Sequence, residues 1–114
     1  MPLDIQARES KDVTILDLKG KIILGAESAS LREAVRGLLD DGKRKILLNL
    51  GNVSFIDSAG VGTLVASFTT ARAAGGEMKL CKLTQKFRET LQVTRLLTVF
   101  ETYDDEAEAI RQFQ

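Results

Sequence analysis

The feature that most constrains the fold is a short apolar run in the middle of the chain, Ile46-Leu47-Leu48-Asn49-Leu50. A strand with one buried face alternates apolar and polar residues, whereas a strand buried on both faces reads as a nearly continuous apolar run. Residues 46–50 therefore predict a central strand in a sheet that is covered on both sides. A chain of 114 residues can build such a core without disulfides or metals.

The segments before and after this run predict helices that pack on the sheet. Between residues 27 and 39 the apolar side chains recur at the i, i+3, i+4, i+7 spacing of a helix on a core. A second helix is predicted to start at Asp57 and Ser58 and to stop at Gly75-Gly76. Its apolar stripe consists of Val61, Leu64, Val65 and Phe68. Both helices are expected to turn these stripes toward the central strand.

The remaining segments continue the alternation of strands and helices. Further strands are predicted at residues 3–8, 13–18 (closed by Gly20, with residues 21–24 as a brief extension), 78–83 and 97–103. Further helices are predicted from Thr84 and from Asp104 or Asp105, the last with Ala107 and Ile110 facing inward. A turn at residues 10–12 joins the first two strands as a hairpin. The pattern predicts an α/β fold: a mixed sheet with an antiparallel N-terminal hairpin, flanked by about four helices that lie mainly on one face. No linker interrupts residues 1–114, so we expect one domain.

The composition excludes several classes of function. The chain has 16 basic and 16 acidic residues, one cysteine and no histidine. It lacks the histidine of common hydrolase sites and the ligands of a structural zinc site, so we expect no catalytic residue, metal or cofactor. The balanced charge offers no binding surface for nucleic acid or an anionic membrane. The N-terminus is too charged for a signal peptide and no apolar stretch is long enough to span a membrane, so a cytoplasmic protein is expected.

The most unusual segment is FIDSAGVG, residues 55–62, between the predicted central strand and the second helix. A polar pair that opens a helix lies beside outward-pointing backbone amides, which favour anions. One interpretation is that Asp57 or Ser58 only caps the helix and that Gly60 and Gly62 permit close packing. The other is that a kinase phosphorylates Ser58, which predicts that the Ser58 hydroxyl is solvent accessible. A phosphate-binding loop and a Ser-Lys hydrolase are disfavoured, because the segment lacks the lysine spacing that each requires.

At these residues the chain resembles the STAS proteins of the anti-sigma factor antagonist type, bacterial proteins that bind a serine kinase acting as an anti-sigma factor. The resemblance covers essentially the whole chain. It rests mainly on an Asp-Ser pair, followed two residues later by a glycine, between a central strand and a helix. Three other segments also carry it: Leu48-Asn49-Leu50, Gly75-Gly76-Glu77-Met78 and residues 87–100. The family's fold, a mixed sheet flanked by helices, agrees with the predicted pattern.

The resemblance implies roles for Ser58 and its neighbours. Ser58 would be the phosphorylated serine, and Asp57 would either orient its hydroxyl and contact the partner or only cap the helix. The implied partner-binding residues are Asp57, Ser58, Ala59, Gly60, Ile23 and Gly25. The implied partners are an anti-sigma factor serine kinase and a serine phosphatase that removes the phosphate. The unphosphorylated form would sequester the kinase and so free a sigma factor.

A second interpretation within the family stays open. The chain would then be a STAS subunit of another assembly, such as a sensory complex or a lipid-transport accessory, in which Ser58 is not a switch. A small hydrolase or nucleotide-binding enzyme that uses Ser58 and Asp57 is the least supported class, because the chain offers no histidine and no suitable general base. We therefore expect a binding module and not an enzyme.

Two positions depart from the family's pattern. Many members carry a second hydroxyl residue after the phosphorylated serine, where this chain has Ala59. Members often have an acidic residue in the loop after the first hairpin, where this chain has Ile23. Three interpretations stay open: the cognate kinase differs, the partner contact there is apolar, or Ile23 turns into the core. Because Ile22, Ile23 and Leu24 cannot all point into one core, at least one of them is expected to be exposed.

A phosphate on Ser58 is expected to change the partner surface and to leave the fold intact. The free amides of Gly60 and Val61 and the helix dipole would stabilise its charge, while Asp57 would repel it. Against a partner surface that fits a neutral hydroxyl, the same charge would lose its water without gaining a partner. The phosphorylated form is therefore expected to release the kinase.

Overall fold

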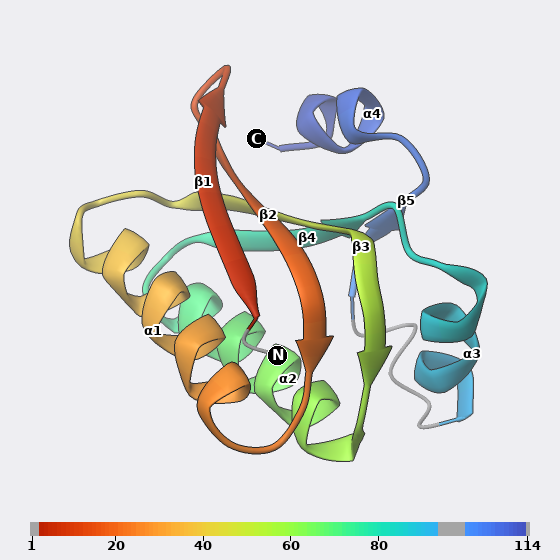
Figure 1. Cartoon of the computed structure of the whole chain (residues 1–114). Coiled ribbons are helices and arrows are strands. Elements are labelled where there is room, and N and C mark those ends of the chain that lie inside the picture. Colours follow the sequence, from red (N-terminus) through yellow and green to blue (C-terminus); the bar gives the residue numbers. More distant parts are fainter. Residues whose placement is uncertain (1–2, 94–99, 114) are drawn as a thin grey trace.

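The computed structural model describes residues 3–93 and 100–113, which form a five-stranded sheet and four helices (Figure 1). The strands are β1 (Asp4–Ser10), β2 (Val13–Ile22), β3 (Lys45–Ile56), β4 (Glu77–Cys81) and β5 (Thr102–Tyr103). The helices are α1 (Ala26–Asp40), α2 (Ser58–Ala73), α3 (Gln85–Val93) and α4 (Glu106–Arg111). The strands lie in the order β1-β2-β3-β4-β5, with β1 antiparallel to β2 and the other neighbouring pairs parallel. The predicted mixed sheet with an N-terminal hairpin is confirmed.

The central strand β3 divides its side chains between two cores, as the apolar run predicts. Ile46, Leu48 and Leu50 are fully buried in the larger core, which also contains residues of α1, α2 and α3. Leu47 points the other way, into a smaller core that α4 covers (Figure 1). Of the four helices in the described residues, three therefore lie on one face of the sheet, which confirms the predicted arrangement.

The smaller core combines a few apolar side chains with a polar network. Its fully or nearly fully buried members are Val13, Ile15, Leu47, Cys81 and Ala109. Burial raises the pKa of the Cys81 thiol to about 11. Beside this core the Arg8 guanidinium donates to Asp17 at 2.6 and 3.1 Å and to Glu106 of α4, and the Asn49 amide donates to Asp17 at 2.9 Å. These bonds tie the N-terminal hairpin and β3 to the C-terminal helix.

Two strand ends differ in part from the prediction. Gly20 does not close β2, and the brief extension predicted at residues 21–24 is observed as far as Ile22. β2 passes through Gly20 because this glycine adopts a φ of 121° and the pairing of β2 with β3 shifts register beside it. β4 stops at Cys81 rather than residue 83, and Lys82 follows with a φ of 58°, which leaves the extended conformation. The longer β2 reaches the start of α2, where the candidate site lies.

The C-terminal segment also differs from the prediction. The strand expected at residues 97–103 is observed as β5 alone, and residues 97–99 lie outside the described residues. The prediction that Ala107 faces inward is wrong, because Ala107 is exposed and Ala109 is buried instead. Asp105 caps α4 by accepting a hydrogen bond from the Ala107 amide at 3.1 Å, which places Ala107 in the first turn, on the outer side. Ile110 packs against the smaller core, as expected.

None of the helices within residues 3–93 and 100–113 combines the length and the apolar character that crossing a bilayer requires.

Candidate functional site

Ser58 occupies the first position of α2, directly after the end of β3. Ile56 ends β3 with a buried side chain, and Asp57 follows as the N-cap of α2 in an extended conformation (φ −101°, ψ −178°). The Ser58 side chain is exposed, while Gly60 and Val61 begin the buried side of the helix. The prediction that Ser58 starts a helix and is accessible is confirmed.

Asp57 joins three pieces of backbone at this point. One carboxylate oxygen, Oδ1, accepts a hydrogen bond from the Gly60 amide at 2.8 Å, and the other, Oδ2, accepts one from the Leu24 amide at 3.1 Å. The Asp57 amide donates to the Ile22 carbonyl at 3.3 Å. Of the two roles left open for Asp57, capping is therefore observed. The carboxylate also fixes the loop between β2 and α1 against α2.

The electrostatics of Asp57 follow from these contacts. The Gly60 amide, and after it the Leu24 amide, hold the pKa of the Asp57 carboxyl below its ordinary value. A carboxylate with a lowered pKa is a weak base, and in the described part of the chain no hydrogen bond joins it to the Ser58 hydroxyl. The pair therefore lacks the geometry of a nucleophile activated by a general base.

The first amides of α2 are less available than the sequence predicts. The Gly60 amide donates to the Asp57 side chain, and the Val61 amide donates to the Asp57 carbonyl at 3.0 Å. The expectation that these two amides are free to bind a phosphate is wrong, because the cap residue already uses both. The positive end of the helix dipole still lies beside Ser58.

The two glycines of the motif have different surroundings. A Cβ added to Gly60 would lie 2.0 Å from the Ile22 carbonyl oxygen and 2.8 Å from Cγ1 of Ile56, so only a glycine fits there. A Cβ added to Gly62 would meet nothing within 4 Å. Two residues along a helix rotate the side-chain direction by about 200°, so Gly60 faces β2 and Gly62 faces solvent. Close packing is confirmed for Gly60 and wrong for Gly62.

The loop between β2 and α1 lies against the start of α2. Ile22 is fully buried, Ile23 is half-buried and Leu24 is 75% exposed. The prediction that at least one of the three is exposed is confirmed, and the residue that projects is Leu24 rather than Ile23. Gly25 follows as the N-cap of α1 with a φ of 109°, a conformation that favours glycine.

Two residues at this surface were not recognised in the sequence. Leu24 was part of a three-residue apolar run, which predicts an exposed member without saying which one. Ser28, buried in the first turn of α1, donates its hydroxyl to the Ile23 carbonyl at 2.7 Å and so fixes the loop from the side opposite Asp57. Nothing in the sequence distinguishes this serine from an ordinary helix serine, because the contact depends on how the loop folds back.

We define the Ser58 surface by its five residues, Leu24, Gly25, Asp57, Ser58 and Ala59. It presents a neutral hydroxyl, small side chains, one apolar side chain and the half-buried carboxylate of Asp57, on a backbone that hydrogen bonds fix at both ends. Within residues 3–93 and 100–113, no group of three or more His, Cys, Asp or Glu residues is arranged to hold a metal ion. The arrangement suits recognition by another macromolecule.

Comparisons with known proteins agree with this architecture. A family model for the STAS domain matches residues 4–109. The chain is 25% identical over 119 residues to an anti-sigma F factor antagonist of Paenibacillus polymyxa, covering 100% of this chain and 97% of that protein. A crystal structure from Thermotoga maritima, of a protein named as a candidate anti-sigma factor antagonist, has a TM-score of 0.87 at 25% identity and covers 96% of this chain and 93% of its own.

The structure of a third similar protein is known in two states. The anti-sigma factor antagonist SpoIIAA from Bacillus has TM-scores of 0.72 in its phosphorylated form and 0.71 in its unphosphorylated form, at 22% and 20% identity. These matches cover 96% of this chain and 98% and 96% of SpoIIAA, respectively. The family model spans nearly the whole chain and the fold agrees with each of these structures. The chain therefore belongs to the STAS domain family, with anti-sigma factor antagonists among its relatives.

Proposed function

We propose that the chain is an anti-sigma factor antagonist whose binding to an anti-sigma factor serine kinase is controlled by phosphorylation of Ser58. The observation that carries the proposal is the exposed Ser58 hydroxyl at the first position of α2, on a backbone fixed by Asp57. The relatives support it, because the chain matches an anti-sigma F factor antagonist over its whole length. SpoIIAA, which has the same fold, exists in a phosphorylated form.

In the unphosphorylated state the Ser58 surface binds the kinase. Ser58, Ala59 and Gly25 have small side chains or none, so a partner's backbone can approach the start of α2 closely. Leu24 adds apolar area that is 75% exposed in the free protein and is removed from water in the complex. The kinase held in this way no longer binds its sigma factor.

Phosphorylation then opposes binding by local electrostatics. A phosphate adds roughly −1.5 to −2 charges at pH 7. The helix dipole favours this charge by about 0.3 to 1 kcal/mol at an exposed site, and the nearby Asp57 carboxylate disfavours it. Because the Ser58 side chain is exposed, the fold stays intact. In the complex the charge lacks a partner that neutralises it, and a loss of a few kcal/mol weakens binding by about a hundredfold or more.

A reversible phosphate on Ser58 requires two other proteins. The kinase supplies the phosphoryl group from ATP, and a serine phosphatase hydrolyses the phosphoserine to restore the binding form. The chain itself acts as substrate and binding partner and not as an enzyme. Because these partners control transcription, the chain would act with them in the cytoplasm.

The test is phosphorylation in vitro. The wild-type chain is incubated with ATP and an anti-sigma factor serine kinase from the same organism, and its intact mass is measured. Ser58→Ala is the test variant, and Ser30→Ala, at an exposed serine of α1, is the matched control. We expect one phosphate on the wild type and on the control and none on Ser58→Ala. An unmodified wild type, or a phosphate retained by Ser58→Ala, would overturn the proposal.

A further inference from the structure

A second feature lies between α1 and α2, away from the Ser58 surface. A cavity of about 450 Å³ opens there, lined from α1 by Arg32 and Arg36 and from α2 by Ser67 and Thr70, among others. Ser67 is nine residues after Ser58, which is roughly 13 Å farther along the axis of α2. The cavity falls within the range of about 300–1,000 Å³ that is typical of small-molecule sites.

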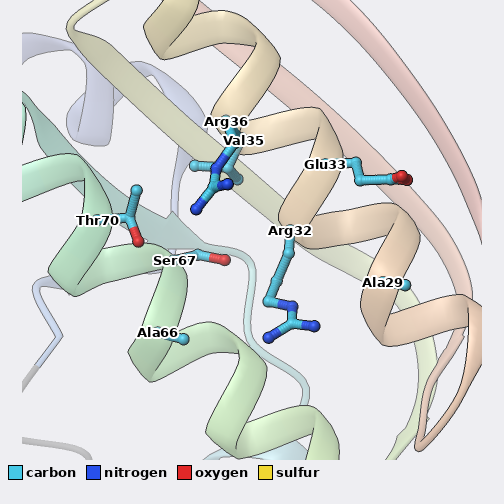
Figure 2. Close-up of a pocket in the computed structure, with 8 residues that line it drawn as sticks. All are labelled: Ala29, Arg32, Glu33, Val35, Arg36, Ala66, Ser67 and Thr70. Atoms are coloured by element: carbon cyan, nitrogen blue, oxygen red, sulfur yellow. The ribbon is translucent and has the colours of Figure 1, made fainter.

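The cavity is lined by two arginines and by one acidic residue, Glu33. Figure 2 shows the guanidinium groups of Arg32 and Arg36 extending from α1 toward α2, while the Glu33 carboxylate points away from α2. In the described part of the chain, neither arginine takes part in an ion pair. Like charges four residues apart on a helix repel each other. An anion bound between the two helices would attract both guanidinium groups and so offset their repulsion.

The floor of the cavity carries a hydroxyl that has no partner. Ser67 is only 2% exposed, and its Oγ is the single buried side-chain polar atom in the described residues without a hydrogen bond. Figure 2 shows this hydroxyl between the two guanidinium groups, with the Thr70 hydroxyl next to it on α2. Buried polar atoms in native proteins almost always have a partner. A ligand oxygen in the cavity would supply one.

We propose that this cavity binds a small molecule through a phosphate group. Two guanidinium groups and two hydroxyls line one cavity and offer many hydrogen-bond donors, which suits the several oxygens and the double negative charge of a phosphate. The rest of the volume leaves room for an organic group. A neutral or cationic ligand would leave the arginine pair uncompensated. This site is separate from the proposed switch at Ser58 and does not depend on it.

The test uses ¹⁵N-labelled protein titrated with three probes: inorganic phosphate, ribose 5-phosphate and succinate. We expect saturable shifts of the Ser67 and Thr70 amides with both phosphates and weaker shifts with succinate. Tighter binding of ribose 5-phosphate would identify a phosphorylated metabolite as the ligand, and equal binding would identify free phosphate. Shifts that do not saturate, or that centre on residues 58–61 instead, would overturn the proposal.

The variants separate a specific site from general charge attraction. Arg32→Gln and Arg36→Gln are each expected to weaken phosphate binding by at least about tenfold. Arg111→Gln on α4 removes the same charge outside the cavity and is expected to change binding less than about twofold, a change that only long-range charge would cause. An equal loss in all three variants would show that net charge alone attracts the phosphate, which contradicts a built site.

Ser67→Ala gives a second, independent readout. It is expected to weaken phosphate binding by about three- to tenfold and, because it removes a buried hydroxyl without a partner, not to lower the melting temperature of the free protein. An unchanged affinity would contradict the assigned role of the hydroxyl. Ser58→Ala is expected to bind phosphate as the wild type does, so failure of this proposal and failure of the switch are distinguishable.

Discussion

α1 and α2 begin beside each other where β2 and β3 end, but their first turns are built differently (Figure 1). The N-cap of α1 is Gly25, which has a φ of 109° and forms no side-chain cap. The N-cap of α2 is Asp57, whose carboxylate accepts hydrogen bonds from the Gly60 and Leu24 amides. One start depends on a backbone conformation that glycine favours. The other depends on a charged cap and on contact with β2.

The difference shows that a glycine can be required for two unrelated reasons within one surface. Gly25 has open space around it, so only its backbone conformation demands a glycine. Gly60 lies inside α2 and lacks space for a Cβ, because β2 approaches it. The first glycine positions the exposed Leu24, and the second brings the start of α2 against the sheet. Together they present Ser58 and Leu24 side by side on a fixed backbone.

The largest effect is expected at Gly60. Gly60→Ala would place a methyl group 2.0 Å from the Ile22 carbonyl oxygen, so β2 or α2 must shift. We expect the free energy of unfolding in urea to fall by about 3 kcal/mol or more. A loss below about 1 kcal/mol would show that α2 moves away from β2 easily, and that its start is not fixed in the way described.

A smaller loss is expected at Gly25. Gly25→Ala forces an alanine to adopt a φ of 109° or the loop to rearrange. The expected cost is about 1 to 3 kcal/mol of unfolding free energy, measured in the same urea experiment. Unchanged stability would contradict the view that this helix start depends on a glycine conformation.

A gain in stability is expected at Gly62. Gly62→Ala adds a methyl group in open space on α2 and should stabilise the chain by about 0.5 to 1 kcal/mol. Gly37→Ala is the matched control, since Gly37 lies in α1 with nothing within 4 Å of its added Cβ. If the kinase approaches the outer side of α2, Gly62→Ala should also weaken kinase binding while Gly37→Ala does not. A loss of stability in Gly62→Ala would show that the site is crowded after all.

The smallest effect is expected from the charge of Asp57. Its pKa is lowered in the folded protein, so the carboxylate stabilises the fold above the unfolded-state pKa of about 3.9, and this contribution is lost as the pH falls through the lower folded-state pKa. Asp57→Asn keeps one cap oxygen, replaces the other acceptor by an amino group and removes the charge, and only the loss of the charge depends on pH. We expect the variant to be less stable than the wild type at pH 7 and the difference to shrink below about pH 4. Asp40→Asn, at the far end of α1, serves as the control, and an Asp57→Asn difference that does not change with pH would contradict the charge contribution.

The fold was predictable because its signals are local. The apolar run at residues 46–50 and the helical stripes that flank it depend on neighbouring residues, and they correctly predict a central strand with covering layers. Ser58 at an exposed helix start was predictable for the same reason. The contact of Gly60 with Ile22 was not, because it depends on how far β2 extends past Gly20 before the chain crosses over to β3.

The predictions about the site that were wrong or incomplete failed for the same reason, because these features depend on contacts between elements that are distant in the sequence. Gly60 and Gly62 look alike in the motif, and only the direction in which each faces separates them. The exposed member of the apolar run turned out to be Leu24, because Ser28 and Asp57 hold the loop by contacts from other elements. The sequence predicts free amides at Gly60 and Val61, but the Asp57 carboxylate accepts a hydrogen bond from the first and the Asp57 carbonyl accepts one from the second.

The most direct test of the switch is the affinity of the kinase for the two forms of the same chain. Calorimetry with the purified serine kinase would compare the unphosphorylated chain, the chain phosphorylated at Ser58, and Ser58→Ala, with circular dichroism to show that each is folded. We expect the first form and Ser58→Ala to bind equally well and the phosphorylated form to bind more weakly by about a hundredfold or more. Equal affinity of the phosphorylated and unphosphorylated forms, both folded, would contradict a phosphorylation switch at Ser58.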